Sequence, residues 1–312
     1  MKTDEKFDSG LVKLPKWFRQ EIPDMNKIRE MKDLFRGSRL HTVCESANCP
    51  NMGTCWKEGV ATFMILGGTC TRACRFCAVP AGRPDLIDRE EPLNVALAVQ
   101  QLGLRYVVVT SVARDDIEDE GADQFAKTIE AIRHLTPDVK IEVLIPDFSA
   151  KEASLKILSD AAPEVISHNI ETVRRLAPHI RPQAFHDRSL QVLRRLGELN
   201  PKAFIKSSLM VGIGETDGEI IETMNELREA GCQILTIGQY LAPTQRRRHL
   251  PVERFVTPEE FESLRQRGLQ MGFAHVESGA LVRSSYIAEQ GYKAAVDAMV
   301  AFRKLADLGV AD

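Results

Sequence analysis

The chain has 312 residues, of which 44% are apolar and 27% charged, and this excludes an intrinsically disordered or collagen-like polypeptide. Its 41 Lys and Arg residues nearly balance its 44 Asp and Glu residues, so no overall charge attracts it to nucleic acid or to an anionic membrane. No stretch approaches the roughly 20 consecutive apolar residues that span a bilayer. The polar start, Met1 to Gly10, resembles neither a signal nor a transit peptide. We therefore expect a cytoplasmic protein with no nucleic-acid or membrane partner.

Regular structure is predicted mainly beyond residue 60. Before it, the pattern predicts one helix over Met25–Phe35. Apolar, often β-branched segments then predict six strands: Ala61–Leu66, Tyr106–Thr110, Ile141–Ile145, Val165–Ser167, Ala203–Met210 and Ile234–Gly238. Amphipathic segments between and after them predict six helices: Leu93–Leu102, Ala122–Leu135, Ala150–Ala161, Ser189–Leu199, Glu219–Ala230 and Pro258–Met271.

This alternation of apolar strands and helices predicts an α/β fold with a parallel sheet covered by helices. The strand–helix units occupy roughly 210 residues, fewer than the about 250 of a closed eight-unit barrel. We therefore predict a partial (β/α)6 TIM-like barrel over residues 61–256, with an N-terminal extension (1–60) and a C-terminal extension (257–312). A doubly wound sheet is the alternative. In both folds the chemistry is expected at the carboxyl ends of the strands.

The distribution of cysteines is the most informative local feature. The chain has seven, and six of them lie between positions 44 and 77. Because no signal sequence directs the chain to an oxidising compartment, this crowding predicts metal binding rather than disulfides. The seventh, Cys232, precedes an apolar run and is expected to be a small buried hydrophobic residue.

One group of three cysteines follows the first predicted strand. The segment reads Cys70-Thr71-Arg72-Ala73-Cys74-Arg75-Phe76-Cys77, with the spacing C-x3-C-x2-C. Iron–sulfur clusters prefer thiolate ligands, and a four-iron cluster needs four, so one iron lacks a local cysteine. An open metal position is typical of catalytic sites. The alternative is a zinc site completed by a distant histidine, although zinc motifs usually space their cysteines in other ways.

A second group, Cys44, Cys49 and Cys55, has the spacing C-x4-C-x5-C. Six thiolates exceed what one cluster needs, so the two groups predict two clusters. Cys232 is disfavoured as a fourth ligand because of its apolar setting. The alternative is a structural cluster or a zinc knot that fastens the N-terminal arm.

The first group, on the loop after the first strand of a β/α chain, resembles the radical S-adenosylmethionine superfamily. The second group, with Pro50-Asn51 and Cys55-Trp56, resembles the lipoyl synthase family, as does the distant segment Arg283-Ser284-Ser285-Tyr286. Other segments that resemble this family are Leu14–Arg19, Thr110–Asp116, His168–Thr172 and Lys206–Gly212.

The resemblance implies two [4Fe–4S] clusters with different roles. Cys70, Cys74 and Cys77 would bind the first, whose open iron chelates S-adenosyl-L-methionine. Reduction then yields methionine and a 5′-deoxyadenosyl radical that removes hydrogen atoms from carbon. The second, auxiliary cluster would be bound by the other three cysteines and by Ser285, with Ser284 as the second choice.

The implied reaction is sulfur insertion at C6 and C8 of an octanoyl group attached to a lysine of a lipoyl carrier domain. The auxiliary cluster would be the sulfur donor, so both clusters must face one cavity. The implied partners are the octanoylated carrier domain or protein, an electron donor such as flavodoxin or ferredoxin, and an iron–sulfur cluster carrier.

Supporting residues are predicted at other strand ends. Gly67 and Gly68 allow close backbone approach to the cofactor, or else form an ordinary turn. Asn169 and Glu171 are candidates to hydrogen-bond the ribose or methionine part of the cofactor, or else are structural. The run Arg246–His249 is either a solvated loop or a surface that steers an acidic carrier domain.

Three other functions remain to be compared. An electron-transfer protein with two four-iron clusters is expected to have four cysteine ligands for each cluster, whereas each group here has three. A zinc-stabilised nucleic-acid module is expected to have a basic surface, whereas the charges of this chain are nearly balanced. Another sulfur-inserting radical enzyme, such as biotin synthase, lacks the pattern of Cys44, Cys49 and Cys55.

Overall fold

The computed structural model describes residues 14–19, 24–46, 49, 51–57, 62–244 and 248–307. The predicted polar start, Met1–Gly10, and Ala61 of the first predicted strand lie outside these ranges. The strands of the described chain are β1 (His41–Thr42), β2 (Thr62–Ile65), β3 (Tyr106–Ser111), β4 (Lys140–Leu144), β5 (Val165–Ser167), β6 (Phe204–Val211), β7 (Ile234–Gln239) and β8 (His275–Gly279). They form one sheet in chain order, parallel from β2 to β8, with β1 antiparallel to β2.

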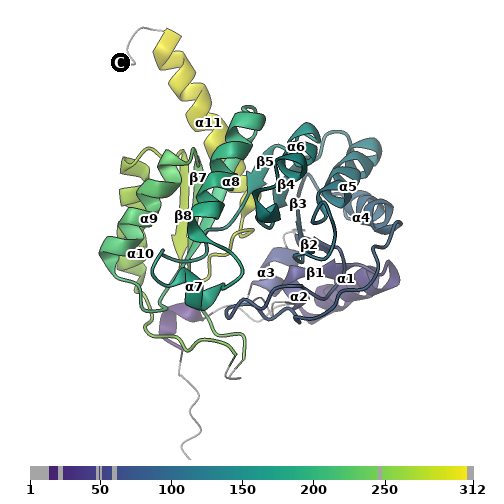
Figure 1. Cartoon of the computed structure of the whole chain (residues 1–312), viewed down its shortest axis with the longest axis horizontal. Coiled ribbons are helices and arrows are strands. Elements are labelled where there is room, and N and C mark those ends of the chain that lie inside the picture. Colours follow the sequence, from purple (N-terminus) through teal and green to yellow (C-terminus); the bar gives the residue numbers. More distant parts are fainter. Residues whose placement is uncertain are drawn as a thin grey trace, which may run out of the picture.

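The helices that follow the strands cover the outer face of this sheet (Figure 1). The larger ones after β2 are α4 (Glu91–Gln101), α5 (Ala122–Leu135), α6 (Glu152–Asp160), α8 (His186–Leu199), α9 (Asp217–Glu229) and α10 (Pro258–Gln270). The rest are α1 (Met25–Gly37), α2 (Val43–Ser46), α3 (Met52–Lys57), α7 (Ala177–Ile180), α11 (Ala288–Asp307) and the short 3₁₀ turns η1 (Lys16–Phe18) and η2 (Phe148–Ala150). Within the described ranges, every helix is too short or too polar to traverse a bilayer.

The predicted partial barrel is confirmed. Each strand from β2 to β7 is followed by a helix that packs on the sheet, and β1 and β8 form open edges among the described strands. The doubly wound alternative is wrong, because the strand order follows the chain order without the reversal that defines that fold.

Strand β8 was not predicted. The segment 257–312 was expected to carry helices and the Arg-Ser-Ser-Tyr segment, yet His275–Gly279 pairs in parallel with β7. This strand contains His275, Glu277 and Ser278 and has no continuous apolar run. An edge strand has a neighbour on one side only, and most of β8 is partly exposed, so its sequence need not be apolar.

Helix α11 covers the amino-terminal ends of the strands. Tyr292 packs against Tyr106 and Phe204, the first residues of β3 and β6, with both ring centroids 5.8 Å away. Ala295 joins the same apolar cluster with Val165, the first residue of β5. This end of the barrel is therefore filled by side chains, and the carboxyl ends remain for a binding site.

The N-terminal extension is fastened to the first parallel strand. Phe35 of α1 packs edge-on against Phe63 of β2, with 5.7 Å between ring centroids and an 89° angle. Strand β1 pairs with β2 on the same edge. Figure 1 shows α1, α2 and α3 at the lower side of the sheet, toward which the arrow of β8 points, and α11 at the upper side. The extension therefore carries its cysteines to the carboxyl ends of the strands.

Candidate active site

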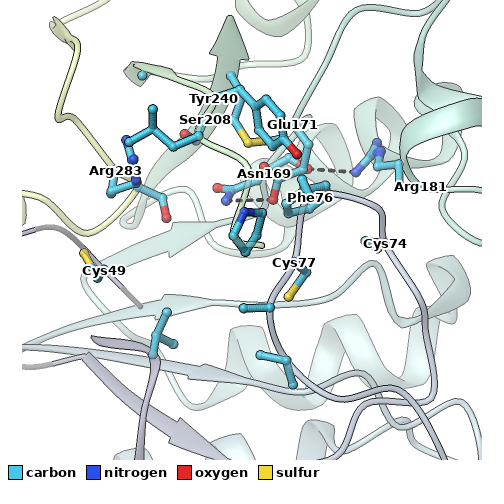
Figure 2. A pocket seen from close by; sticks show the side chains of 18 of the residues that line it. Cys49, Cys74, Phe76, Cys77, Asn169, Glu171, Arg181, Ser208, Tyr240 and Arg283 are labelled. Atoms are coloured by element: carbon cyan, nitrogen blue, oxygen red, sulfur yellow. Dashed lines mark hydrogen bonds between the residues drawn. The ribbon is translucent and has the colours of Figure 1, made fainter. Parts of the chain in front are cut away.

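A cavity of about 980 Å³ lies at the carboxyl ends of the strands and brings the two cysteine groups together. Its walls include five of the six clustered cysteines and the predicted serines and polar residues: Cys44, Cys49, Cys70, Cys74, Cys77, Asn169, Glu171, Ser284 and Ser285. Figure 2 shows Cys49 and Arg283 on one side of the cavity and Cys74 and Cys77 on the other. Both groups therefore face one chamber.

The loop that carries the first group is closed on itself by backbone hydrogen bonds. Leu66 and Gly67 adopt positive φ angles of 69° and 89°, which turn the chain away from β2. The amide of Cys70 donates to Pro80 O (2.8 Å), and the amide of Gly82 donates back to Cys70 O (2.9 Å). The segment between them is held as a compact loop, with Cys74 and Cys77 on the stretch that it encloses.

Gly67 and Gly68 serve this turn and do not line the cavity. A Cβ on Gly68 would meet the ring of His41 at 3.3 Å, whereas a Cβ on Gly67 would meet nothing within 4 Å. The geometry therefore accounts for Gly67 by its backbone conformation and for Gly68 by the close approach of β1.

The thiol environment fits a cationic cluster. Cys70 Sγ accepts hydrogen bonds from the amides of Arg72 (3.4 Å) and Ala113 (3.3 Å). Burial, and after it the neighbouring Cys77, raises the pKa of Cys74 to about 12. Thiols of this kind lose their protons to a metal group that offsets the crowded negative charge.

The second group has the same character. Its loop is tied by hydrogen bonds from Cys49 N to Cys44 O (3.0 Å) and from Cys55 N to Asn51 O (2.9 Å). Burial, and after it the charges of Cys44 and Cys49, raises the pKa of Cys55 to about 12. Pro50 of this motif lies outside the described residues.

Both cysteine groups supply the soft thiolate donors that iron–sulfur clusters prefer. The spacing C-x3-C-x2-C of the first group differs from the paired cysteines that are usual in zinc motifs. The donor chemistry of each group therefore fits an iron–sulfur cluster.

The Arg-Ser-Ser-Tyr segment lies against the second cysteine group. Asn51 Nδ2 donates to Leu281 O at 2.5 Å, across 230 residues of sequence. The pKa of the Arg283 guanidinium is lowered by burial and raised by nearby Cys49. Burial raises the pKa of Tyr286, and Cys55 adds to this shift. The two serines therefore belong to the same wall of the cavity as the N-terminal cysteines.

Asn169 and Glu171 lie together, between Arg283 and Arg181 in the view of Figure 2, and Asn169 Nδ2 donates to Glu171 Oε1 at 3.1 Å. Asn169 Oδ1 is buried and has no hydrogen-bond partner among the described residues. Burial raises the pKa of Glu171, while Arg181 and Asn169 oppose the rise. A buried acceptor without a partner in a polar corner is suited to a ligand hydroxyl or amine.

Sequence reasoning missed the ion network that anchors the first loop. Arg72 stands between two of the cysteines, and its buried guanidinium contacts Asp115 (2.5 Å) and Asp147 (2.7 Å). Arg188 contacts the other oxygen of Asp147 at 2.7 Å. Burial alone would raise the pKa of Asp147, but Arg72, with smaller contributions from His168 and Arg188, lowers it to about 2. Asp115 lies in the polar stretch after β3, so the sequence could have indicated its part in this network. No sequence pattern pointed to Asp147.

A second missed chain of hydrogen bonds holds Arg181 beside Cys74. Burial lowers the pKa of His168 to about 4, so its ring is neutral at pH 7. Its Nδ1 donates to Ile145 O (3.0 Å), and its Nε2 accepts from Ser189 Oγ (2.9 Å). Ser189 Oγ in turn accepts from Arg181 Nη2 at 2.7 Å. The guanidinium is thereby fixed next to the first cysteine group.

Within the run Arg246–His249, the two described residues, Arg248 and His249, contact the first cysteine loop. Arg246 and Arg247 lie outside the described residues, but Arg248 Nη2 donates to Cys77 O (3.0 Å) and Val79 O (3.3 Å). His249 Nε2 lies 3.0 Å from the same Cys77 oxygen. This segment therefore fastens the far end of the first cysteine loop.

Comparison with known proteins identifies the family. Residues 64–227 match the model of the radical SAM superfamily. The chain is 54% identical over 276 residues to the lipoyl synthase of Rubrobacter xylanophilus, with 88% of this chain and 85% of that protein covered. It is 55% identical to the lipoyl synthase of Symbiobacterium thermophilum (88% and 86% covered) and 51% identical to that of Syntrophotalea carbinolica (92% of each).

Solved structures share the fold at low sequence identity. HydG, a maturase of the [FeFe]-hydrogenase, superposes with a TM-score of 0.54 at 15% identity, over 82% of this chain and 56% of that one. Methylornithine synthase (PylB) superposes with a TM-score of 0.51 at 15% identity, over 68% and 62%. The chain thus spans less than two thirds of either structure. The identities of about one half over nearly the full length of the relatives decide the assignment: the chain belongs to the lipoyl synthase family of the radical SAM superfamily.

Proposed function

We propose that this radical S-adenosylmethionine sulfurtransferase binds two [4Fe–4S] clusters, each on one cysteine group. Cys70, Cys74 and Cys77 bind the first, and Cys44, Cys49 and Cys55 bind the second with Ser285 as its fourth ligand. The observation that carries this proposal is the shared cavity, which is lined by cysteines of both groups and by Ser284 and Ser285. Two clusters that must act on one substrate need such a common chamber.

The first group leaves one coordination position for S-adenosyl-L-methionine. When bound, the cluster and this cofactor supply a carbon-centred radical, and the second cluster supplies sulfur. The proposal assigns Asn169 and Glu171 to the polar part of the cofactor, and it is supported by the Asn169 oxygen, which is buried without a hydrogen-bond partner among the described residues. Arg181, held by Ser189, supplies a fixed positive charge at the same corner.

The remaining walls are suited to an acyl chain. Apolar residues predominate there, among them Met64, Leu144, Tyr240, Leu250 and Phe255. Such a lining binds the octanoyl chain through its methylene groups and excludes water, which would quench a reactive carbon centre. We propose replacement of one hydrogen by sulfur at C6 and another at C8 of a protein-bound octanoyl group.

The proposed partners follow from this chemistry. An octanoylated lipoyl carrier domain brings the substrate, an electron donor such as flavodoxin or ferredoxin reduces the first cluster, and a cluster carrier rebuilds the second. Arg248, which is exposed beside the cavity residue His249, is one basic contact for an acidic carrier. We propose a cytoplasmic location, because thiols that must stay reduced to bind iron need a reducing compartment.

Cys44→Ala tests the division of roles. The anaerobically reconstituted variant is expected to form 5′-deoxyadenosine while giving no sulfur insertion into an octanoylated lysine peptide, both measured by mass spectrometry. Cys232→Ala is the matched control, since that thiol is buried apart from both groups. Loss of both reactions in Cys44→Ala, with the control active, would contradict separate roles. Absence of 5′-deoxyadenosine in the unaltered protein would favour electron transfer.

A further inference from the structure

Val282, the residue directly before the Arg-Ser-Ser-Tyr segment, lies against Gly238 near the end of β7. A Cβ added to Gly238 would stand 2.2 Å from Val282 O and 3.1 Å from Val282 C. Gly238 does not have a positive φ, so alanine is compatible with its backbone conformation. The missing side chain therefore serves the close approach of the Val282 carbonyl and not the local backbone.

The residue before Val282 is bound by Asn51, within the second cysteine group. Asn51 is 2% exposed, and its Nδ2 donates to Leu281 O at 2.5 Å. Its own carbonyl accepts from Cys55 N at 2.9 Å. One residue therefore connects the cysteine loop to the peptide group that directly precedes Val282.

Arg283 adds a third contact between the same two parts. Arg283 Nη1 donates to Val282 O at 2.7 Å, and its charge lies near Cys49 (Figure 2). Ser284 and Ser285 follow immediately and line the cavity. The position of both serine oxygens thus depends on where the Leu281 and Val282 carbonyls are fixed.

We propose that Gly238 and Asn51 are positioning residues that set the distance between the serines and the second cysteine group. This inference rests on the proposed function, because it acts through the serine ligand. With alanine at 238, Val282 O must retreat by about 1 Å before an ordinary contact is reached. A metal–ligand bond tolerates only about 0.2 Å, so the serine would lose its iron.

The test measures how fast each cluster gives up iron. The reconstituted protein, without S-adenosylmethionine or substrate, is mixed anaerobically with a coloured ferrous chelator. Gly238→Ala and Asn51→Ala are each expected to release about half of the bound iron at least about tenfold faster than the unaltered chain. The other half should be unchanged, and 5′-deoxyadenosine should still form when S-adenosylmethionine and a reductant are added.

Gly218→Ala is the matched control. It is another glycine without positive φ, and a Cβ there would meet nothing within 4 Å. Its iron release should equal that of the unaltered chain. A general loss of structure would accelerate release from both clusters and lower the thermal midpoint, whereas a positioning effect is confined to one half of the iron.

The outcomes separate this inference from the function on which it rests. If Ser284→Ala or Ser285→Ala accelerates release but Gly238→Ala and Asn51→Ala do not, the positioning inference is wrong and the serine ligand stands. If neither serine variant changes release, the serine ligand itself is wrong, and the positioning inference fails with it. If Gly238→Ala does not fold, the test rests on Asn51→Ala. An unchanged rate of iron release from Asn51→Ala then overturns the inference.

Discussion

Arg72→Met removes the cation that fastens the first cysteine loop to the barrel. The Arg72 side chain is 7% exposed and contacts Asp147, which is fully buried, and Asp115. Methionine matches the length of the aliphatic stem but leaves Asp147 with Arg188 as its remaining cationic contact at 2.7 Å. We expect the variant to fold with lower stability and to hold the first cluster less well.

The magnitude follows from the pKa of Asp147. The drop from 3.8 to about 2 corresponds to about 2 kcal/mol of preference for the charged form. Breaking a buried pair typically costs about 3 to 5 kcal/mol, and the remaining Arg188 keeps the loss near the lower end. A loss of about 2 to 3 kcal/mol in a chain of this length lowers the thermal midpoint by about 3 to 5 °C.

The stability difference between Arg72→Met and the unaltered chain is expected to depend on pH. Asp147 has a lowered pKa in the folded state, so its contribution is complete above about pH 4 and is lost as the pH falls through about 2. The difference between Arg72→Met and the unaltered chain should therefore be constant from pH 5 to 7 and shrink below pH 4. The assay is thermal unfolding of the reduced, cluster-free chain by circular dichroism, at one scan rate.

Arg195→Met is the control for this experiment. Arg195 also forms a close ion pair, with Glu152 at 2.5 Å, but both side chains are exposed. Its thermal midpoint should not change measurably. If Arg72→Met has the same thermal midpoint as the unaltered chain at pH 7, the reasoning about the buried network is refuted. It is also refuted if the difference between the two midpoints is as large at pH 3 as at pH 7.

Three further predictions concern the cavity. Cys74→Ala should stop 5′-deoxyadenosine formation, seen by chromatography, and continued formation would contradict the place of the first cluster. Ser285→Ala should alter the Mössbauer spectrum of the second cluster while Ser284→Ala does not; the reverse result would exchange the ligand. Gly212→Ala should lower the thermal midpoint, because its φ is +93° and a Cβ would lie 2.1 Å from Gln239 Nε2, a strain of about 1 to 3 kcal/mol. An unchanged midpoint would contradict this prediction, since moving Gln239 aside relieves neither the positive φ nor the contact with Arg254 O at 2.5 Å.

Elements with strong local patterns were predicted well. The amphipathic run Ala122–Leu135 is α5 with the same bounds, and Val165–Ser167 is β5. The edge strand β8 was missed, because its stability comes from pairing with β7 rather than from an apolar run. The division into residues 1–60, 61–256 and 257–312 stays a prediction.

The amino-acid sequence by itself determined the cysteine groups and the strand–helix alternation. Ligand spacing and hydrophobic periodicity are local properties, and each is complete within a segment of the chain. From them the cluster-type donors and the partial barrel could be predicted before any contact was known.

Tertiary structure alone decided which distant residues support these ligands. Asn51 reaches Leu281 across 230 residues, and Arg72 reaches Asp147 on the far side of two strands. Gly238 matters because the Val282 carbonyl stands against it. Such contacts carry no periodic signal, since they depend on where the folded sheet places loops that follow different strands.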